Sequence, residues 1–146
     1  MTTYRTTPPP TDRGAVRRLV AETSVFSETE AGWAVEVIEA ALDRGCVATG
    51  YHFLFADNGG EREGFTCFGP IDGTANRFDL YWIAVSPTAQ GKGLGRKLLA
   101  ESMTAARASF RRLLVPGGIA LATDTIGFFT ILFIQIEVIR EIVGFG

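Results

Sequence analysis

The chain has 146 residues, of which 47% are hydrophobic and 21% are charged, and its formal net charge at pH 7 is −2. This is the length of one domain with a core of ordinary size, and we expect residues 1–146 to form a single domain. The only adjacent basic pairs are Arg17-Arg18, Arg96-Lys97 and Arg111-Arg112, so the sequence carries no basic tract. The charge pattern therefore disfavours a nucleic-acid partner.

The sequence gives little support for a metal site or a disulfide. Cys46 and Cys67 belong to no C-x-x-C pair, and His52 is the only histidine. We therefore expect no bound metal and two free, buried thiols in the reducing environment of the cytoplasm. Residues 1–10 contain a proline run and no apolar core, so we expect no signal peptide there.

The segment 117–136 is strongly apolar and could be mistaken for a membrane span. Asp124 interrupts it near its middle, where a charged residue in a spanning helix costs a few kcal/mol. A buried strand followed by a helix is the favoured interpretation.

The first part of the chain predicts a short strand and two helices. Residues 4–7 are expected to form an edge strand, and a helix is expected to begin at Thr11 or Asp12 and end near Glu22. Residues 27–30 read S-E-T-E, a capping box, and predict a second helix over 28–43 that ends at Gly45. Its inward residues are expected to be Trp33, Val37, Ile38 and Leu42.

A hairpin and a third strand are expected next. Residues 47–56 are rich in β-forming residues, 57–60 read as a turn, and 63–69 form the returning strand. Residues 78–85, FDLYWIAV, are apolar on both faces after Asp79, which predicts a central strand covered from both sides.

The rest of the chain predicts a helix over 91–110, a strand over 118–123, a short helix or loop from 127, and a last strand over 136–143. The core stripe of the long helix is expected to be Leu94, Leu98, Leu99 and Met103. The predicted fold is α+β in three αβα layers. Its central sheet is mixed, mostly antiparallel, with about six to seven strands flanked by helices.

A glycine-rich segment between the strand at 78–85 and the long helix carries the strongest functional signal. A helix N-terminus leaves several backbone N–H groups unpaired and carries partial positive charge. Glycines let a phosphate approach these groups closely, and Lys92 and Arg96 add full charges. The segment therefore predicts a phosphate-bearing ligand at the start of this helix.

Two common phosphate-binding motifs do not fit this segment. A P-loop requires Ser or Thr after G-K, but Gly93 follows Lys92. A dinucleotide fingerprint requires a third glycine at position 96, which is Arg96. A nucleotide-binding domain of another family is an alternative interpretation of this segment, but the glycine spacing argues against it.

The residues Gln90-Gly91-Lys92-Gly93-Leu94-Gly95 resemble the acetyl-CoA-binding motif Q/R-x-x-G-x-G/A of the GNAT superfamily of N-acetyltransferases. The preceding DLYWIAV strand and the following RKLLAESM helix also resemble that family, as does the order helix, helix, hairpin before them. The resemblance extends from Val16 to about Met103. It implies a GNAT-like fold and an enzyme that transfers an acetyl group from acetyl-CoA to a primary amine by direct attack.

The resemblance also implies roles for individual residues. The backbone of 83–85 would bind the pantetheine arm, the backbone of 90–96 the pyrophosphate, and an N–H near Val85 the thioester carbonyl. The implied cofactor-binding residues are Ile83, Ala84, Val85, Gln90, Gly91, Lys92, Gly93, Leu94, Gly95 and Arg96. Asp79 aligns with the catalytic glutamate of the histone-type branch of the family and is the candidate general base, with Glu63 and Glu101 as weaker candidates.

The general acid is left unassigned. Phe128-Phe129 stands where the family often has a Phe-Tyr pair, and Tyr81 is interpreted as a core residue. The acceptor pocket is expected along the first helices and the loop 70–77, with a small-molecule amine as the acceptor. Phe26, Trp33 and Phe68 are candidates to line it, but core packing is the favoured role for each.

The segment from about 124 departs from the family pattern. Residues 133–139, FIQIEVI, have the composition of an exposed strand, which invites pairing with a second copy and predicts a homodimer. An aberrant tail on a marginal domain is the alternative. The missing tyrosine also keeps open a non-catalytic CoA-binding or interaction module on the same fold.

Overall fold

The structure is a computed structural model that describes residues 1–74, 77–109, 111, 126 and 144. The chain divides into two compact units, Met1–Arg107 and Ala108–Gly146. The elements predicted at 118–123, from 127 and at 136–143 lie outside the described residues. The expectation of a single domain stays a prediction.

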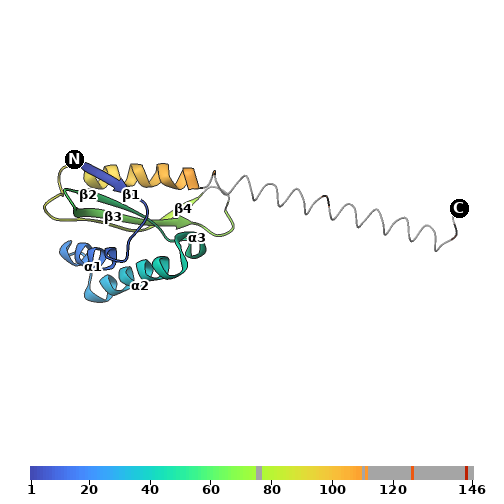
Figure 1. Cartoon of the computed structure of the whole chain (residues 1–146), viewed down its shortest axis with the longest axis horizontal. Coiled ribbons are helices and arrows are strands. Elements are labelled where there is room, and N and C mark those ends of the chain that lie inside the picture. Colours follow the sequence, from blue (N-terminus) through green and yellow to red (C-terminus); the bar gives the residue numbers. More distant parts are fainter. Residues whose placement is uncertain (75–76, 110, 112–125, 127–143, 145–146) are drawn as a thin grey trace. The chain divides into compact units, whose positions relative to one another are not determined.

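The first unit contains an antiparallel sheet of four strands (Figure 1). The strands β1 (Thr2–Arg5), β2 (His52–Asn58), β3 (Glu61–Pro70) and β4 (Phe78–Val85) are hydrogen-bonded in the order β1-β2-β3-β4. The α+β class is confirmed. We expected a mixed sheet of about six to seven strands, and the described residues contain four strands, all antiparallel.

Helices cover both faces of this sheet. The helices α1 (Asp12–Glu22) and α2 (Glu28–Arg44) lie on one face, and a helix over residues 94–109 lies on the other (Figure 1). The Ser27 hydroxyl accepts from the Glu30 N–H at 3.2 Å, and the Glu30 carboxylate accepts from the Ser27 N–H at 2.7 Å. The predicted capping box is therefore confirmed, as is the end of α2 at Gly45, whose φ is 88°.

The prediction of a strand from residue 47 was wrong at its start. Residues 46–49 form a short helix, α3 (Cys46–Thr49), and β2 begins only at His52. Gly45 and Gly50 both have positive φ and isolate this turn from the elements on either side. The Thr49 hydroxyl donates to the Gly45 carbonyl at 2.9 Å and closes it. These local constraints outweigh the strand preference of Val47 and Thr49.

Two apolar cores lie on the two faces of the sheet. The core under α1 and α2 includes Val16, Leu19, Val20, Ala31, Ala34, Ile38, Phe53, Phe55 and Phe65, and the core under helix 94–109 includes Leu54, Phe68, Ala89, Leu94, Leu98 and Ala106. The side chains of β2 thus alternate between the two cores, and both faces of the strand are buried.

Three residues predicted on the inward faces of the two long helices are exposed. Trp33 is 54% exposed, because α2 turns its alanines and Ile38 toward the sheet instead. Leu99 and Met103 are 43% and 52% exposed, because the inward stripe of helix 94–109 continues from Leu98 to Ser102. The predicted core stripe did not include Ser102, because only apolar residues were assigned to it.

Helix 94–109 is attached to the sheet by a buried pair of hydroxyls. The Ser102 and Thr66 hydroxyl oxygens are 2.5 Å apart, and Ser102 also donates to the Leu98 carbonyl at 2.8 Å. Both side chains are buried, so this contact satisfies polar groups that would otherwise be stranded in the core.

The hairpin between β2 and β3 turns at Gly59-Gly60, with φ values of 58° and 88°. Positive φ at both central residues is typical of a type I′ turn, which glycine adopts without strain. The predicted turn is confirmed at these glycines, although Asp57 and Asn58 belong to β2.

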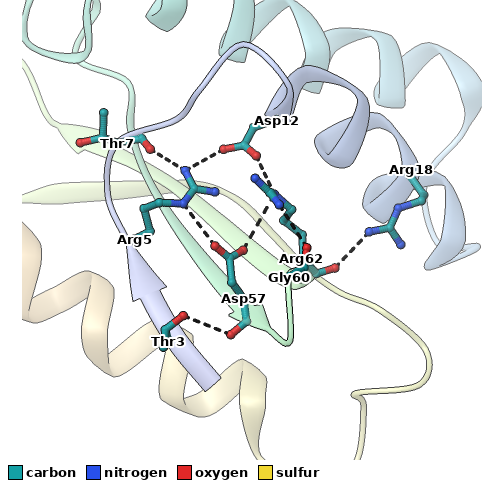
Figure 2. Close-up of polar contacts among 8 residues, drawn as sticks. All are labelled: Thr3, Arg5, Thr7, Asp12, Arg18, Asp57, Gly60 and Arg62. Carbon is teal, nitrogen blue, oxygen red and sulfur yellow. Dashed lines mark hydrogen bonds and ion pairs between the residues drawn. The ribbon is translucent and has the colours of Figure 1, made fainter. Parts of the chain in front are cut away.

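A cluster of two arginines and two aspartates ties four elements together near this hairpin (Figure 2). The Asp12 carboxylate at the start of α1 lies 2.8 Å from Arg5 of β1 and 2.7 Å from Arg62 of β3. Asp57 of β2 lies 3.2 Å from Arg5 and 3.9 Å from Arg62. Asp12 is fully buried, so its charge is held by these two guanidinium groups.

Candidate active site

The turn that follows β4 is closed by its own hydrogen bonds. The Ser86 carbonyl accepts from the N–H groups of Ala89 at 2.9 Å and Gln90 at 3.1 Å, and the Ser86 and Thr88 hydroxyls lie 3.0 Å apart. The Ser86 N–H donates to the Glu63 carbonyl of β3 at 2.7 Å. The loop is therefore fixed to the sheet by groups of the protein itself.

Beyond this turn the backbone presents a row of free donors. Gly91 and Gly93 have φ values of 77° and 79°, and the helix begins at 94 rather than at 91 as predicted, because neither glycine is in a helical conformation. Within the described part of the chain, no backbone carbonyl accepts a well-aligned hydrogen bond from the N–H groups of residues 91–96. Successive free N–H groups at a helix start form an anion-binding concavity.

The charged side chains within this row are positive. Lys92 and Arg96 are exposed and take part in none of the ion pairs between described residues. Beside the loop, Lys92 and Lys97 line a cleft of about 180 Å³ together with Glu63 and Asn58. An anionic group at residues 91–96 would thus meet backbone donors and two unpaired cations.

The register of β4 determines which of its backbone groups remain available. The Ser86 N–H points to β3, and in an antiparallel ladder the groups that point to the partner strand alternate along the chain. The N–H and C=O groups of Ala84 therefore face β3, whereas those of Ile83 and Val85 face away from it.

A β-bulge interrupts β4 at Tyr81. Cys67 of β3 pairs with Trp82, and Phe68 pairs with Leu80, so Tyr81 has no partner residue. A bulge redirects the side chain of the extra residue and breaks the alternation of the strand.

The Tyr81 side chain reaches across β3 toward β2. Its ring packs edge-to-face on Tyr51, with centroids 5.6 Å apart, and a Cβ on Gly69 would come within 2.9 Å of it. Burial and the nearby Asp79 carboxylate raise the pKa of the Tyr81 phenol, which is therefore protonated at neutral pH.

The expectation that β4 is covered from both sides was wrong for the described residues. Leu80, Tyr81 and Ile83 are 42%, 41% and 36% exposed, and β4 is the last strand in the described sheet. The interpretation of Tyr81 as a core residue was therefore also wrong. A continuous apolar run does not by itself distinguish a doubly covered strand from one that presents an open apolar edge.

Asp79 lies near the start of β4, paired in register with Gly69. It is exposed and lines an apolar pocket of about 120 Å³ with Phe68, Phe78, Leu80 and Met103 among its neighbours. An extended strand rises about 3.3 Å per residue, and Val85 follows Asp79 by six positions. Asp79 therefore lies roughly 20 Å from the end of β4, where the glycine-rich loop follows. A ligand that reaches both must run along β4.

The weaker candidate bases lie elsewhere. The Glu63 carboxylate accepts from Asn58 at 3.1 Å and lines the cleft beside the loop, at the opposite end of β4 from Asp79. Glu101 is exposed on helix 94–109. Neither is brought next to Asp79.

The three candidate acceptor-pocket residues are not brought together. Phe26 packs edge-to-face on Trp82, with centroids 5.3 Å apart, in the core under α1 and α2. Phe68 is buried in the opposite core, and Trp33 is exposed on α2. Phe128 and Phe129 lie outside the described residues.

Two features of the site are absent from the sequence interpretation. The Gln90 side-chain amide donates to the Val85 carbonyl at 3.0 Å, whereas the resemblance implied only a role for the Gln90 backbone. The bulge at Tyr81 has no sequence signal, because no glycine or proline marks it.

Within the described ranges, no group of three or more His, Cys, Asp or Glu side chains could hold a metal ion. No helix in the same residues is long and apolar enough to cross a membrane. Cys46 and Cys67 are free thiols, and burial raises the pKa of each.

A glycine-rich loop at a helix start follows β4, the last strand of the described α+β sheet, which has helices on both faces. This arrangement is suited to an elongated, phosphate-bearing ligand. Residues 49–130 match the family model of the acetyltransferase (GNAT) domain. The chain belongs to the GNAT family of acetyltransferases.

Solved structures of this family are similar to the chain. A protein assigned to the GNAT acetyltransferases from Desulfovibrio desulfuricans is 40% identical, with a TM-score of 0.71 over 75% of this chain and 68% of that one. A GNAT family acetyltransferase from Brucella melitensis, solved with acetyl-CoA, is 23% identical, with a TM-score of 0.57 over 75% and 70%.

The ribosomal-protein-S18-alanine N-acetyltransferase from Escherichia coli is 22% identical, with a TM-score of 0.55 over 75% of this chain and 61% of that one. These last two likenesses support the fold alone. Among curated protein sequences, none matches this chain.

Proposed function

We propose that this protein transfers the acetyl group of acetyl-CoA to a primary amine, in a ternary complex and without a covalent enzyme intermediate. The observation that carries the proposal is the row of backbone N–H groups at residues 91–96, which have no well-aligned backbone acceptor among the described residues. This row follows β4, whose outer edge pairs with no strand in the described sheet. A pyrophosphate joined to an extended, amide-containing arm has the matching shape and charge.

The proposed cofactor contacts follow from the directions in which the backbone groups of β4 and of residues 91–96 point. The N–H groups of 91–96, with Lys92 and Arg96, hold the pyrophosphate, and Gln90 begins this loop. The outward backbone groups of Ile83 and Val85 pair with the pantetheine arm as an added strand would, and Ala84 lies between them facing β3. An outward N–H of β4 near Val85 is the proposed donor to the thioester carbonyl.

Asp79 is proposed as the general base. An alkyl amine is mostly protonated at neutral pH, since its pKa is close to that of a lysine side chain, about 10. Asp79 removes one proton, directly or through water, and the neutral nitrogen attacks the thioester carbon. The C–S bond then breaks and the thiolate leaves with the electron pair, while the nitrogen loses its second proton to water as the amide forms. Its exposed position at the rim of an apolar pocket supports this role.

The substitution Asp79→Asn tests the chemistry. It keeps the size of the side chain and removes the base, so kcat is expected to fall by about 10²–10⁴-fold, while the Kd for acetyl-CoA stays unchanged. Glu101→Gln is the matched comparison, because Glu101 is one of the weaker candidate bases and lies exposed on helix 94–109, and this variant is expected to leave kcat unchanged. Equal kcat for Asp79→Asn and wild type would remove Asp79 from the mechanism.

A small-molecule amine is the proposed acceptor, because neither an acidic nor a basic docking tract is present in the sequence. The second candidate is a CoA-binding module without catalysis, which Phe129 favours because a phenol often stands there in the family. Retained acetyl-CoA binding with no turnover over a broad panel of amines would select it.

The composition of residues 133–139 supports a homodimer as a further proposal. Sedimentation of the full chain at micromolar concentration tests it, and a monomer contradicts it. The two unpaired thiols support a location in the reducing cytoplasm.

A further inference from the structure

The side chain of Gln90 folds back onto the strand that precedes its own loop. Its Nε2 donates to the Val85 carbonyl at 3.0 Å, while its backbone N–H donates to the Ser86 carbonyl at 3.1 Å. Gln90 thus bonds the last residue of β4 with its side chain and the first residue of the turn with its main chain.

The Val85 carbonyl that Gln90 occupies belongs to the open edge of β4. The alternation described above turns the backbone of Val85 away from β3, so without Gln90 this carbonyl would have no hydrogen-bond donor among the described residues. With Gln90 in place, the outward groups nearest the loop that lack a partner in the described sheet are the Val85 N–H and both backbone groups of Ile83.

We propose that Gln90 is a positioning residue, which locks the loop 86–93 onto the end of β4 before the cofactor binds. The inference rests on the proposed function, because it assigns the loop to the pyrophosphate of acetyl-CoA. The glycines at 91 and 93 make the loop intrinsically free, since both adopt positive φ. A bond that restrains this freedom in advance lowers the ordering cost that the ligand must overcome.

The size of the effect is limited by exposure. Gln90 is exposed, and a single neutral hydrogen bond has a modest net value because water competes for both partners. We expect removal of the side-chain donor to weaken acetyl-CoA binding by about three- to tenfold, rather than to abolish it.

The test compares two substitutions at this position by calorimetry with acetyl-CoA. Gln90→Met keeps the length of the side chain and removes the donor, and the expected result is a Kd about three- to tenfold higher than that of wild type. Gln90→Arg keeps an N–H donor at the end of a long side chain and is expected to retain most of the wild-type affinity. Both variants are expected to keep the Tm of wild type, because the contact lies outside both cores.

A Kd for Gln90→Met equal to or lower than that of wild type would overturn the proposal. Equal losses of acetyl-CoA affinity in Gln90→Met and Gln90→Arg would also overturn it. Amide hydrogen exchange without ligand separates this result from a failure of the proposed function. Gln90→Met is expected to speed exchange at Ala89 and Gln90, whose N–H groups bond the Ser86 carbonyl, whether or not the protein binds acetyl-CoA. Exchange rates at both amides equal to those of wild type would contradict the proposed restraint of the loop directly.

Discussion

The Ser27 hydroxyl and the Glu30 carboxylate each accept a backbone N–H at the start of α2. Hydrogen bonding to Ser27 lowers the pKa of Glu30, so the carboxylate stays ionised in the folded protein down to a more acidic pH than in the unfolded chain. We expect Ser27→Ala to lower the free energy of unfolding by about 1 kcal/mol, measured by urea denaturation.

Thr11 provides the matched control for this prediction. It occupies the N-cap position of α1, but its side chain makes no capping hydrogen bond. Thr11→Ala is therefore expected to change the free energy of unfolding by less than about 0.5 kcal/mol. Equal effects of the two substitutions would show that the capping bond of Ser27 contributes nothing.

His52 gives the protein a pH-dependent stability. It stacks on Phe68, with ring centroids 5.8 Å apart, and burial lowers its pKa below the ordinary 6.5. The unfolded chain then binds a proton more readily than the folded protein, so this contribution is complete above pH 6.5 and is lost as the pH falls through the folded pKa. We expect wild type to lose more stability than His52→Gln between pH 7.5 and pH 5, in urea titrations at both values. A parallel loss in the two proteins would contradict this.

At the scale of elements, the cluster of Arg5, Asp12, Asp57 and Arg62 joins β1, α1, β2 and β3 (Figure 2). The Asp12→Asn substitution leaves two guanidinium groups around a buried site that has lost its negative charge. We expect it to lower the free energy of unfolding by about 3 kcal/mol, because removing one partner of a buried ion pair leaves the charge of the other partner uncompensated.

Glu39→Gln is the control for this prediction. Glu39 pairs with Arg13 at 3.0 Å, but the two side chains are 40% and 54% exposed. Exposed pairs contribute about 0–1 kcal/mol, so the control should stay within that range in the same denaturation experiment. A loss for Asp12→Asn no larger than that of the control would mean that the cluster adds nothing to stability.

The same elements show what local pattern can predict. The capping box and Gly45 give the bounds of α2 closely, because both signals act within one turn of the chain. The start of β2 was wrong because glycines on both sides of residues 46–49 allow a separate helical turn, and the inward face of helix 94–109 was wrong because Ser102 pairs with a distant hydroxyl on β3. Tertiary contacts of this kind leave no periodic signal.

For the molecule as a whole, the glycine-rich loop could be predicted as an anion site because its chemistry is local: glycines, a helix start and two cations. The end of β4 could not be predicted in the same way. The outward direction of Val85, the contact with Gln90 and the bulge at Tyr81 depend on the register between β3 and β4, which the sequence does not specify residue by residue. Asp79 as a base remains a prediction from the resemblance.

Gly95 offers the most direct test of the cofactor loop. Unlike Gly91 and Gly93 it has no positive φ, and a Cβ there would meet only Val85 Cγ2 at 3.8 Å, an ordinary contact. A side chain at this position is therefore compatible with the fold, and an aspartate in the first turn of a helix is favourable to it.

The measurement is the affinity for acetyl-CoA, by calorimetry, of wild type, Gly95→Asn and Gly95→Asp. If the N–H groups of 91–96 hold the pyrophosphate, wild type binds, the neutral asparagine weakens binding, and the aspartate of the same size abolishes it while circular dichroism shows an intact fold. Equal affinities of the asparagine and aspartate variants, or no binding by wild type, would contradict the assignment of this loop to the cofactor.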